Sequence, residues 1–328
     1  MEVWRSSVIR STIVSGLRKT VFRGHSYLGR FKDPVWLLGD ARSGTTWTAS
    51  LINYDKSFRE LFEPFNHRNV DEMRGVLPQL YLRPDEEDED LEVFANRVFK
   101  GTFSNQWSDF ENKRPFYRGL LIKDVWANLF SFWASRRFPE VKKLFLIRNP
   151  FAVALSKSKT MHWNWIADPL HFKKQDRLFA DFLEPYEDLM EKTSHEKDCV
   201  VCQVLIWCIL NMVPLKQFSI GELKIVFYED MYLNPVDTTN AIFEYIQRPD
   251  RQLDPEVHRN VIKKPSSFAS DKSNVWLGTS PLTTWKNELN TQQIDKGLEI
   301  LDRFGFSDLY AKEDSPNIKV IEDMQRSG

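Results

Sequence analysis

Two glycines bracket a short polar segment near the start of the chain and make it a candidate phosphate-binding loop. Residues 35–47 read VWLLG followed by DARSGTTW, an apolar run that enters a polar turn. Gly39 and Gly44 allow backbone N–H groups to face inward, and the start of a following helix adds its positive dipole end. The spacing matches the triphosphatase loop GxxxxGK(S/T), but Thr45 stands where the lysine belongs. The loop is therefore predicted to bind an anion without that lysine, with Arg42 as the cation.

A second segment has the same order of parts. Residues 143–147 form an apolar run after their first lysine, Arg148 follows, and Pro150 suits the first turn of a helix. Ser156 comes eight residues after Arg148, where its hydroxyl could face the same anion. An arginine in an ion pair beside a core strand would have the same sequence, so this segment alone leaves both interpretations open.

Both segments belong to a pattern that alternates short apolar runs with helical stretches. The predicted strands are 35–38, 120–122, 143–147 and 223–228. The predicted helices follow Gly44 and Pro150 and cover 125–137, 179–193, 199–217 and 291–304. The acidic run 85–90 is expected to be a solvated loop or a helix start. Such alternation predicts the α/β class, with a central parallel sheet like that of P-loop proteins, flanked by helices on both faces.

Composition narrows the class of protein. The chain has 328 residues, 42% of them hydrophobic, which is enough for a substantial core. Its 45 basic and 46 acidic side chains give a net charge of −1, which disfavours a nucleic-acid partner. Cys199, Cys202 and Cys208 provide no disulfide framework and favour a reducing, cytoplasmic compartment. The first two have metal-site spacing, but their apolar neighbours favour a buried helix.

The chain is expected to have three parts: a basic N-terminal segment (1–32), one catalytic domain (33–310) and a C-terminal tail (311–328). In the first segment several basic residues are opposed only by Glu2 and are interleaved with apolar ones. Such a helix can make peripheral contact with a membrane surface, or it can pack on its own domain or on the second subunit of a homodimer. Packing is the favoured interpretation. No apolar run long enough to span a membrane is expected.

Taken together, the two anion segments resemble those of the PAPS-dependent sulfotransferase superfamily. In that family the loop that holds the 5′-phosphosulfate of 3′-phosphoadenosine 5′-phosphosulfate (PAPS) looks like (K/R)SGTTW, and the segment that clamps the 3′-phosphate looks like RxPxxxxxS. The resemblance implies PAPS as the donor, PAP as the product and no metal. It also implies that the nucleotide is held by Arg42, Ser43, Gly44, Thr45, Thr46, Trp47, Arg148 and Ser156.

Later segments continue the resemblance. The run 223–228 leads into YED, similar to a late strand of the family, and this implies that Tyr228 lies near the nucleotide. Residues 264–274 and the later TWK at 284–286 resemble the loop that closes over the nucleotide. Ser267 and Lys272 are the candidate contacts there.

Sulfuryl transfer needs an acceptor in line with the leaving phosphate, a base for its proton, and cations that stabilise the growing charge. Arg42 is one candidate cation, and Lys123, at the end of the predicted strand 120–122, is the second. In cytosolic members of the family this lysine begins a KTH motif that supplies a histidine base. This chain has KDV instead, which makes a phenol or steroid acceptor a poor fit.

The run LFEPFNH at 61–67 resembles the FEP segment of carbohydrate sulfotransferases, in which the glutamate is the proposed base. We therefore expect Glu63 to be the general base, with His67 as the alternative, since a carboxylate shielded from water can have its pKa raised toward the working pH. His162 is a third candidate. Its stretch, MHWNW, is more typical of an acceptor-binding wall, in which Trp163 and Trp165 stack on sugar faces.

The predicted acceptor is a hydroxyl or amine of a carbohydrate or glycolipid, and a small natural product is the alternative. A kinase-like phosphotransferase would need magnesium and a compensating lysine, and Thr45 argues against it. A non-catalytic protein on the same fold is disfavoured because the candidate residues are all present, namely Arg42, Glu63, Lys123, Arg148 and Ser156.

Overall fold

The described part of the chain forms one five-stranded sheet in which every pair of neighbouring strands is parallel. The computed structural model describes residues 33–256, 280–310 and 316–327, with 20–22, 24, 28, 31 and 259. The strand order is β2-β3-β1-β4-β5. The strands are β1 (Val35–Gly39), β2 (Phe58–Phe62), β3 (Gly119–Lys123), β4 (Lys142–Ile147) and β5 (Lys224–Phe227). The four predicted strands are all present.

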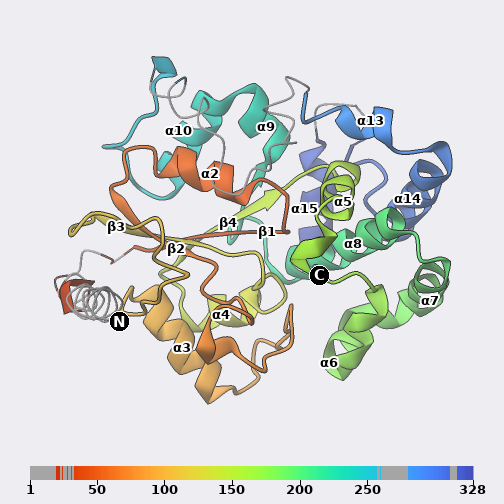
Figure 1. The fold of residues 1–328 in the computed structure, drawn as a ribbon, viewed down its shortest axis with the longest axis horizontal. Helices are drawn as coiled ribbons and strands as arrows, with labels where there is room; N and C mark the ends of the chain where they lie inside the picture. The colour runs from red at the N-terminus through yellow and green to blue at the C-terminus, as the bar shows by residue number, and fades with distance from the viewer. Residues whose placement is uncertain are drawn as a thin grey trace, which may run out of the picture.

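Helices cover both faces of this sheet, which confirms the predicted fold class (Figure 1). On one face lie α2 (Thr45–Ile52), α9 (Tyr228–Leu233) and α10 (Pro235–Tyr245); on the other lie α3 (Glu89–Phe99), α4 (Ser131–Arg137) and α8 (Cys199–Gln217). The remaining α-helices are α5 (Pro150–Ser158), α6 (Asp176–Leu178), α7 (Glu187–Glu196), α13 (Thr284–Glu288), α14 (Thr291–Arg303) and α15 (Ile318–Ser327).

Successive side chains of the central strand β1 point alternately into two hydrophobic cores, one on each face of the sheet. Val35 and Leu37 face α2 and α10, whereas Trp36 and Leu38 face the core that contains α3, α4 and α8. All five residues of β1 are buried, as expected for a strand covered on both faces. Because the strands are parallel, their carboxyl ends lie at one edge of the sheet, and the loops that follow β1, β2, β3 and β4 meet there.

In the right half of the molecule in Figure 1, several helices pack against α8. It is apolar all round, and α5, α14 and α15 pack against it. Within the described part of the chain it is the one helix long and apolar enough to cross a membrane, but 89% of that stretch is buried inside the protein. Cys202 and Cys208 lie within this core, as the predicted buried helix requires.

The structure departs from the predicted elements in three places. Residues 125–130 form turns rather than the start of a helix, because the Asp124 carboxylate accepts the Trp126 N–H at 2.6 Å. The predicted helix 179–193 begins as a π-helical turn (Phe179–Leu183) and a 3-10 turn (Glu184–Tyr186), and only its second half belongs to α7. The acidic run, in contrast, is a helix start as predicted, because it leads into α3, whose N-cap Asp88 accepts the Leu91 N–H. Strand β2 was not predicted, because its sequence FRELF carries two charged residues that are both buried.

The predicted C-terminal tail contains a helix. Helix α15 packs on α8 and buries Ile321 and Met324. The N-terminal segment (1–32), for which membrane contact or packing was predicted, lies largely outside the described residues.

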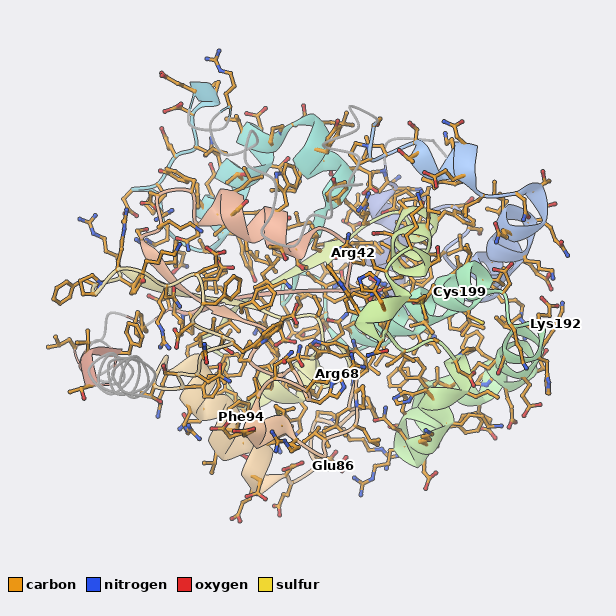
Figure 2. All side chains as sticks on the ribbon, in the orientation of Figure 1. Arg42, Arg68, Glu86, Phe94, Lys192 and Cys199 are labelled. Atoms are coloured by element: carbon orange, nitrogen blue, oxygen red, sulfur yellow. The ribbon has the colours of Figure 1, made fainter. Side chains whose placement is uncertain are left out.

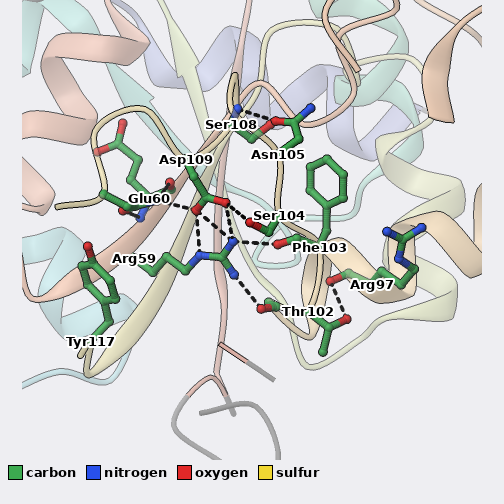
Figure 3. A network of polar contacts seen from close by, with 12 residues as sticks. Arg59, Glu60, Arg97, Thr102, Phe103, Ser104, Asn105, Ser108, Asp109 and Tyr117 are labelled. Carbon is green, nitrogen blue, oxygen red and sulfur yellow. Dashed lines mark hydrogen bonds and ion pairs between the residues drawn. The ribbon is translucent and has the colours of Figure 1, made fainter. Parts of the chain in front are cut away.

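Arg59 is one of the two charged residues of β2, and its side chain is fully buried (Figure 3). Its guanidinium forms a two-pronged ion pair with Asp109 at 2.9 and 2.8 Å and donates to the carbonyls of Gly101 and Phe103. Asp109 also accepts from Ser104 and Asn112. This network fixes the loop 101–112 along the outer edge of β2, the strand that leads to Glu63.

Replacing Arg59 by methionine should destabilise the protein strongly, because it leaves the Asp109 carboxylate buried without a countercharge. We expect a loss of about 3 to 5 kcal/mol in the free energy of unfolding, measured by denaturant titration. Arg74→Met, which removes an exposed pair with Asp71, is the control and should cost about 1 kcal/mol or less. Equal losses in the two variants would contradict the structural role of the network.

Candidate active site

The loop between β1 and α2 forms a narrow turn at the carboxyl edge of the sheet. Arg42 and Gly44 both have left-handed backbone, with φ of 69° and 100°. The Ser43 N–H and hydroxyl both donate to the Asp40 carbonyl, at 3.1 and 2.6 Å. A Cβ atom at position 44 would lie only 2.5 Å from the Tyr228 ring, so this position requires glycine. The loop is thus a tight cradle with Tyr228 packed against it.

A buried ion pair fastens the cradle to α5. Lys157 Nζ donates to both carboxylate oxygens of Asp40 at 2.7 Å, and both side chains are almost fully buried. Burial raises the pKa of Asp40, and the nearby Lys157 ammonium opposes that shift. Sequence analysis missed this pair, although Asp40 lies inside the glycine string and Lys157 directly follows Ser156.

The two arginines predicted from separate segments meet beside this cradle. Arg42 Nε donates to Ser156 Oγ at 2.9 Å, and Arg148 donates to the Arg42 carbonyl at 3.1 Å and to the Pro281 carbonyl at 2.9 Å. Burial, reinforced by the positive charge of Arg148, lowers the pKa of Arg42 to about 10. The Nε of Arg148 is buried without a hydrogen-bond partner. No described carboxylate forms an ion pair with either arginine, so the pair is a candidate anion site.

The YED string, residues 228–230, begins α9 and contacts the segment that carries Arg148. The Arg148 guanidinium lies 4.2 Å from the centre of the Tyr228 ring, which also contacts Trp47 edge-on. Burial raises the pKa of Tyr228. Glu229 accepts the backbone N–H of Asn149, so the start of α9 holds the segment that carries Arg148. Of the other predicted nucleotide ligands, Thr45 is buried and Thr46 is half-buried at the start of α2.

Glu63 and Lys123 lie at the ends of neighbouring strands and form a second charged group. Lys123 Nζ lies 2.7 Å from Glu63 Oε1, and only 3% and 12% of the two side chains are exposed. Glu63 Oε2 accepts from Asn66 at 3.0 Å and from the Trp126 indole at 3.3 Å. The Glu63 backbone is left-handed, with φ of 43°. Two residues predicted separately are therefore brought together, and the loop holding Glu63 adopts a costly conformation typical of functional sites.

Asp124 joins the elements around this pair. Its carboxylate accepts the backbone N–H of Phe65 at 2.9 Å and that of Trp126 at 2.6 Å, and its own N–H donates to the Leu37 carbonyl. The side chain thereby ties the FEP segment and Trp126 to the central strand β1. Sequence analysis noted Asp124 only as a departure from KTH, because its partners are distant in sequence.

His67, the alternative base, contacts Trp126 instead of the Glu63 carboxylate. The imidazole and indole rings meet edge-on with centroids 4.7 Å apart. Burial, with further contributions from Arg68 and His171, lowers the pKa of His67 to about 4. The imidazole is therefore neutral at pH 7 and a weaker base than an ordinary histidine.

A tryptophan wall connects the two charged groups. Trp163 lies under the Arg42 guanidinium at 5.0 Å and contacts Trp165, whose ring stacks on Trp126 with centroids 6.2 Å apart. His162 is exposed at the end of this wall and contacts Trp163. The predicted acceptor residues thus lie between the anion site and Glu63. Trp126, which sequence analysis did not single out, completes the wall; its one signal was its closeness to Lys123.

Ser267 and Lys272, the predicted contacts of the closing loop, lie outside the described residues.

Comparison with known proteins gives a family. The family model described as the sulfotransferase domain matches residues 32–304. Curated protein sequences show no match. Similar solved structures include the sulfotransferase domain of the Synechococcus PCC 7002 olefin synthase, with 15% identity over 83% of this chain and 94% of that chain and a TM-score of 0.45. They also include mouse sulfotransferase SULT7A1 complexed with PAP, with 13% identity over 95% of this chain and 96% of that chain and a TM-score of 0.42.

The buried Asp124 should make stability depend on pH. Burial raises its pKa from 3.8 to about 7, so the folded protein holds this proton to a higher pH than the unfolded chain does. Stability from this group is therefore present below about pH 4 and is lost as the pH rises to about 7. Asp124→Asn cannot ionise, but its amide cannot accept both backbone N–H groups, which adds a constant penalty.

As the pH rises from about 4 to about 7, we expect the free energy of unfolding of Asp124→Asn to increase by about 4 kcal/mol relative to that of the wild type. Denaturant titrations of both proteins across this range measure the difference. A difference that does not change with pH would show that Asp124 is ionised throughout.

Proposed function

Because this chain belongs to the sulfotransferase family, we propose that it transfers a sulfuryl group from PAPS to a hydroxyl of a carbohydrate or glycolipid, with Glu63 as the general base. The observation that carries the proposal is the meeting of Arg42 and Arg148 without a described carboxylate partner, connected through the tryptophan wall to the Glu63–Lys123 pair. Two neighbouring guanidinium groups that form no ion pair with a described carboxylate suit a ligand with several negative charges.

The donor residues fit a nucleotide that carries anions at both its 5′ and 3′ positions. The first turn of α2 has no side-chain cap, so its N–H groups can bind oxygens beside Arg42. The unpaired Nε of Arg148 can donate to a second anion, and Ser156, which accepts from the adjoining Arg42, is the hydroxyl that we expect to bind the same anion. We assign Arg42 and the start of α2 to the 5′-phosphosulfate, and Arg148 with Ser156 to the 3′-phosphate. When bound, PAPS supplies the sulfuryl group.

The contacts of Glu63 define where an acceptor hydroxyl can donate its proton. A carboxylate has about four acceptor positions. Asn66 and Trp126 use Oε2, and Lys123 uses one position on Oε1, which leaves a position on the oxygen nearest the lysine. We infer that the hydroxyl proton passes to this oxygen as the acceptor oxygen bonds to sulfur. The bond between sulfur and the phosphate oxygen then breaks, and Lys123 and Arg42 stabilise the negative charge that develops.

The tryptophan wall supports a ring-shaped acceptor. Trp126 bonds to Glu63 through its indole N–H, is buried, and stacks on Trp165, which meets Trp163 edge-on. Trp163 and Trp165 are half-buried and offer the exposed aromatic surface. Sugar rings present C–H groups on their faces that pack on such surfaces, while their hydroxyls stay free to reach the base. The same wall would also admit a small natural product with a flat ring.

Glu63→Gln should lower turnover by about two to four orders of magnitude while the affinity for PAP stays near that of the wild type, because the amide cannot take the proton. Turnover is measured as transfer from radiolabelled PAPS to a panel of monosaccharides and glycolipids, and PAP affinity by calorimetry. Glu72→Gln, which removes a carboxylate paired with Arg97 near the surface, is the matched control. Wild-type turnover in Glu63→Gln would exclude this residue as the base.

A further inference from the structure

Arg68 lies at the outer side of the tryptophan wall and is held in place although it is exposed. Its guanidinium donates to the carbonyl of Trp163 at 2.8 Å and to that of Asn164. It also lies over the Trp126 ring, 5.7 Å from the centroid. Asn164 has left-handed backbone, which ends the short helix Met161–Trp163 and turns the chain at these carbonyls. An exposed arginine is ordinarily mobile, so these contacts preorganise its charge.

Among the described residues, the Arg68 charge has no ion-pair partner, whereas Arg74, on the same segment, is paired with Asp71 at 2.6 Å. The two carboxylates that accept from Trp126 are already engaged: Glu63 pairs with Lys123, and Asp124 accepts two backbone N–H groups. The guanidinium uses two of its N–H groups on carbonyls and keeps others for a ligand.

Arg68 and the base lie on one indole ring. The Trp126 N–H bonds to Glu63 Oε2 at 3.3 Å, and the face of the same indole lies under Arg68. Figure 2 shows Arg42 and Arg68 in the same central region of the molecule, and Trp163 contacts both, Arg42 with its ring and Arg68 with its carbonyl. An acceptor packed on the partly exposed Trp163 and Trp165 with one hydroxyl at Glu63 would therefore place another substituent near Arg68, which bonds to the Trp163 carbonyl.

We propose that Arg68 is a specificity-determining residue that binds an oxyanion of the acceptor, so that the acceptor is an acidic sugar carrying a carboxylate, sulfate or phosphate. This inference rests on the proposed function and narrows its acceptor class. A tryptophan wall alone would accept neutral sugars equally well. A fixed guanidinium with no countercharge among the described residues favours an anionic partner, because the planar fork of arginine matches two oxygens of such a group.

The test compares two glycosides that differ only at C6, p-nitrophenyl β-D-glucuronide and p-nitrophenyl β-D-glucoside, on the full chain saturated with PAP. We expect the wild type to bind the glucuronide at least about tenfold more tightly by calorimetry. Arg68→Gln should lose this preference while keeping the wild-type affinity for the glucoside. Arg68→Lys should retain part of the preference, and Arg74→Gln, the matched control, all of it.

The outcomes separate this inference from the proposed function. Failure of PAP to bind would refute the donor site itself. If PAP binds, equal affinity for the two glycosides in the wild type, or no binding of either, overturns the acidic-acceptor inference. A preference that persists in Arg68→Gln assigns the anion to another residue and also overturns it. Equal weakening of both glycosides in that variant would mean that Arg68 only holds the turn at Asn164.

Discussion

Arg42 and Arg148 hold like charges close together without a described carboxylate between them, and much of the surrounding structure keeps them there. Burial and mutual repulsion lower the pKa of Arg42 to about 10, so the arrangement is unfavourable without an anion. The buried Asp40–Lys157 pair fixes the loop to α5, and Tyr228 packs under Arg148. These contacts offset the repulsion and leave a preorganised site that an anionic ligand would relieve.

The part of the site that contains Glu63 and Lys123 depends on a different constraint, the register of the neighbouring strands β1, β2 and β3. Phe62 pairs with Lys123, and Leu37 also pairs with Lys123, so Glu63, Lys123 and the loop after β1 start from the same level of the sheet. Asp124 then connects the FEP segment to Trp126 through two backbone N–H groups. Trp163 joins the two halves, because its ring lies under Arg42 and its carbonyl accepts from Arg68. The site is thus one connected structure built on neighbouring strand ends.

The residues that sequence analysis identified are those whose role is encoded locally. The glycine loop and the Arg148 segment are each a strand, a turn and a helix in succession, and this order is visible within a dozen or so residues. Sequence analysis did not predict strand β2, because Arg59 and Glu60 interrupt its apolar pattern. Both residues are buried by contacts with a loop some fifty residues away in the sequence. Residues 125–130 have a helical pattern, but the Asp124 carboxylate captures the Trp126 N–H instead. Contacts between distant segments determine the positions of Lys157, Trp126 and Arg68, and the local sequence does not show these contacts.

The most direct test of the account is calorimetric binding of PAP compared with ATP and magnesium, which requires no knowledge of the acceptor. We expect PAP to bind at least about tenfold more tightly, because we assign Arg148 and Ser156 to a 3′-phosphate that ATP lacks, and because the lysine that ATP-binding loops use is replaced by Thr45. Tighter binding of magnesium ATP would contradict the assignment of the two arginines and, with it, the proposed sulfuryl transfer from PAPS.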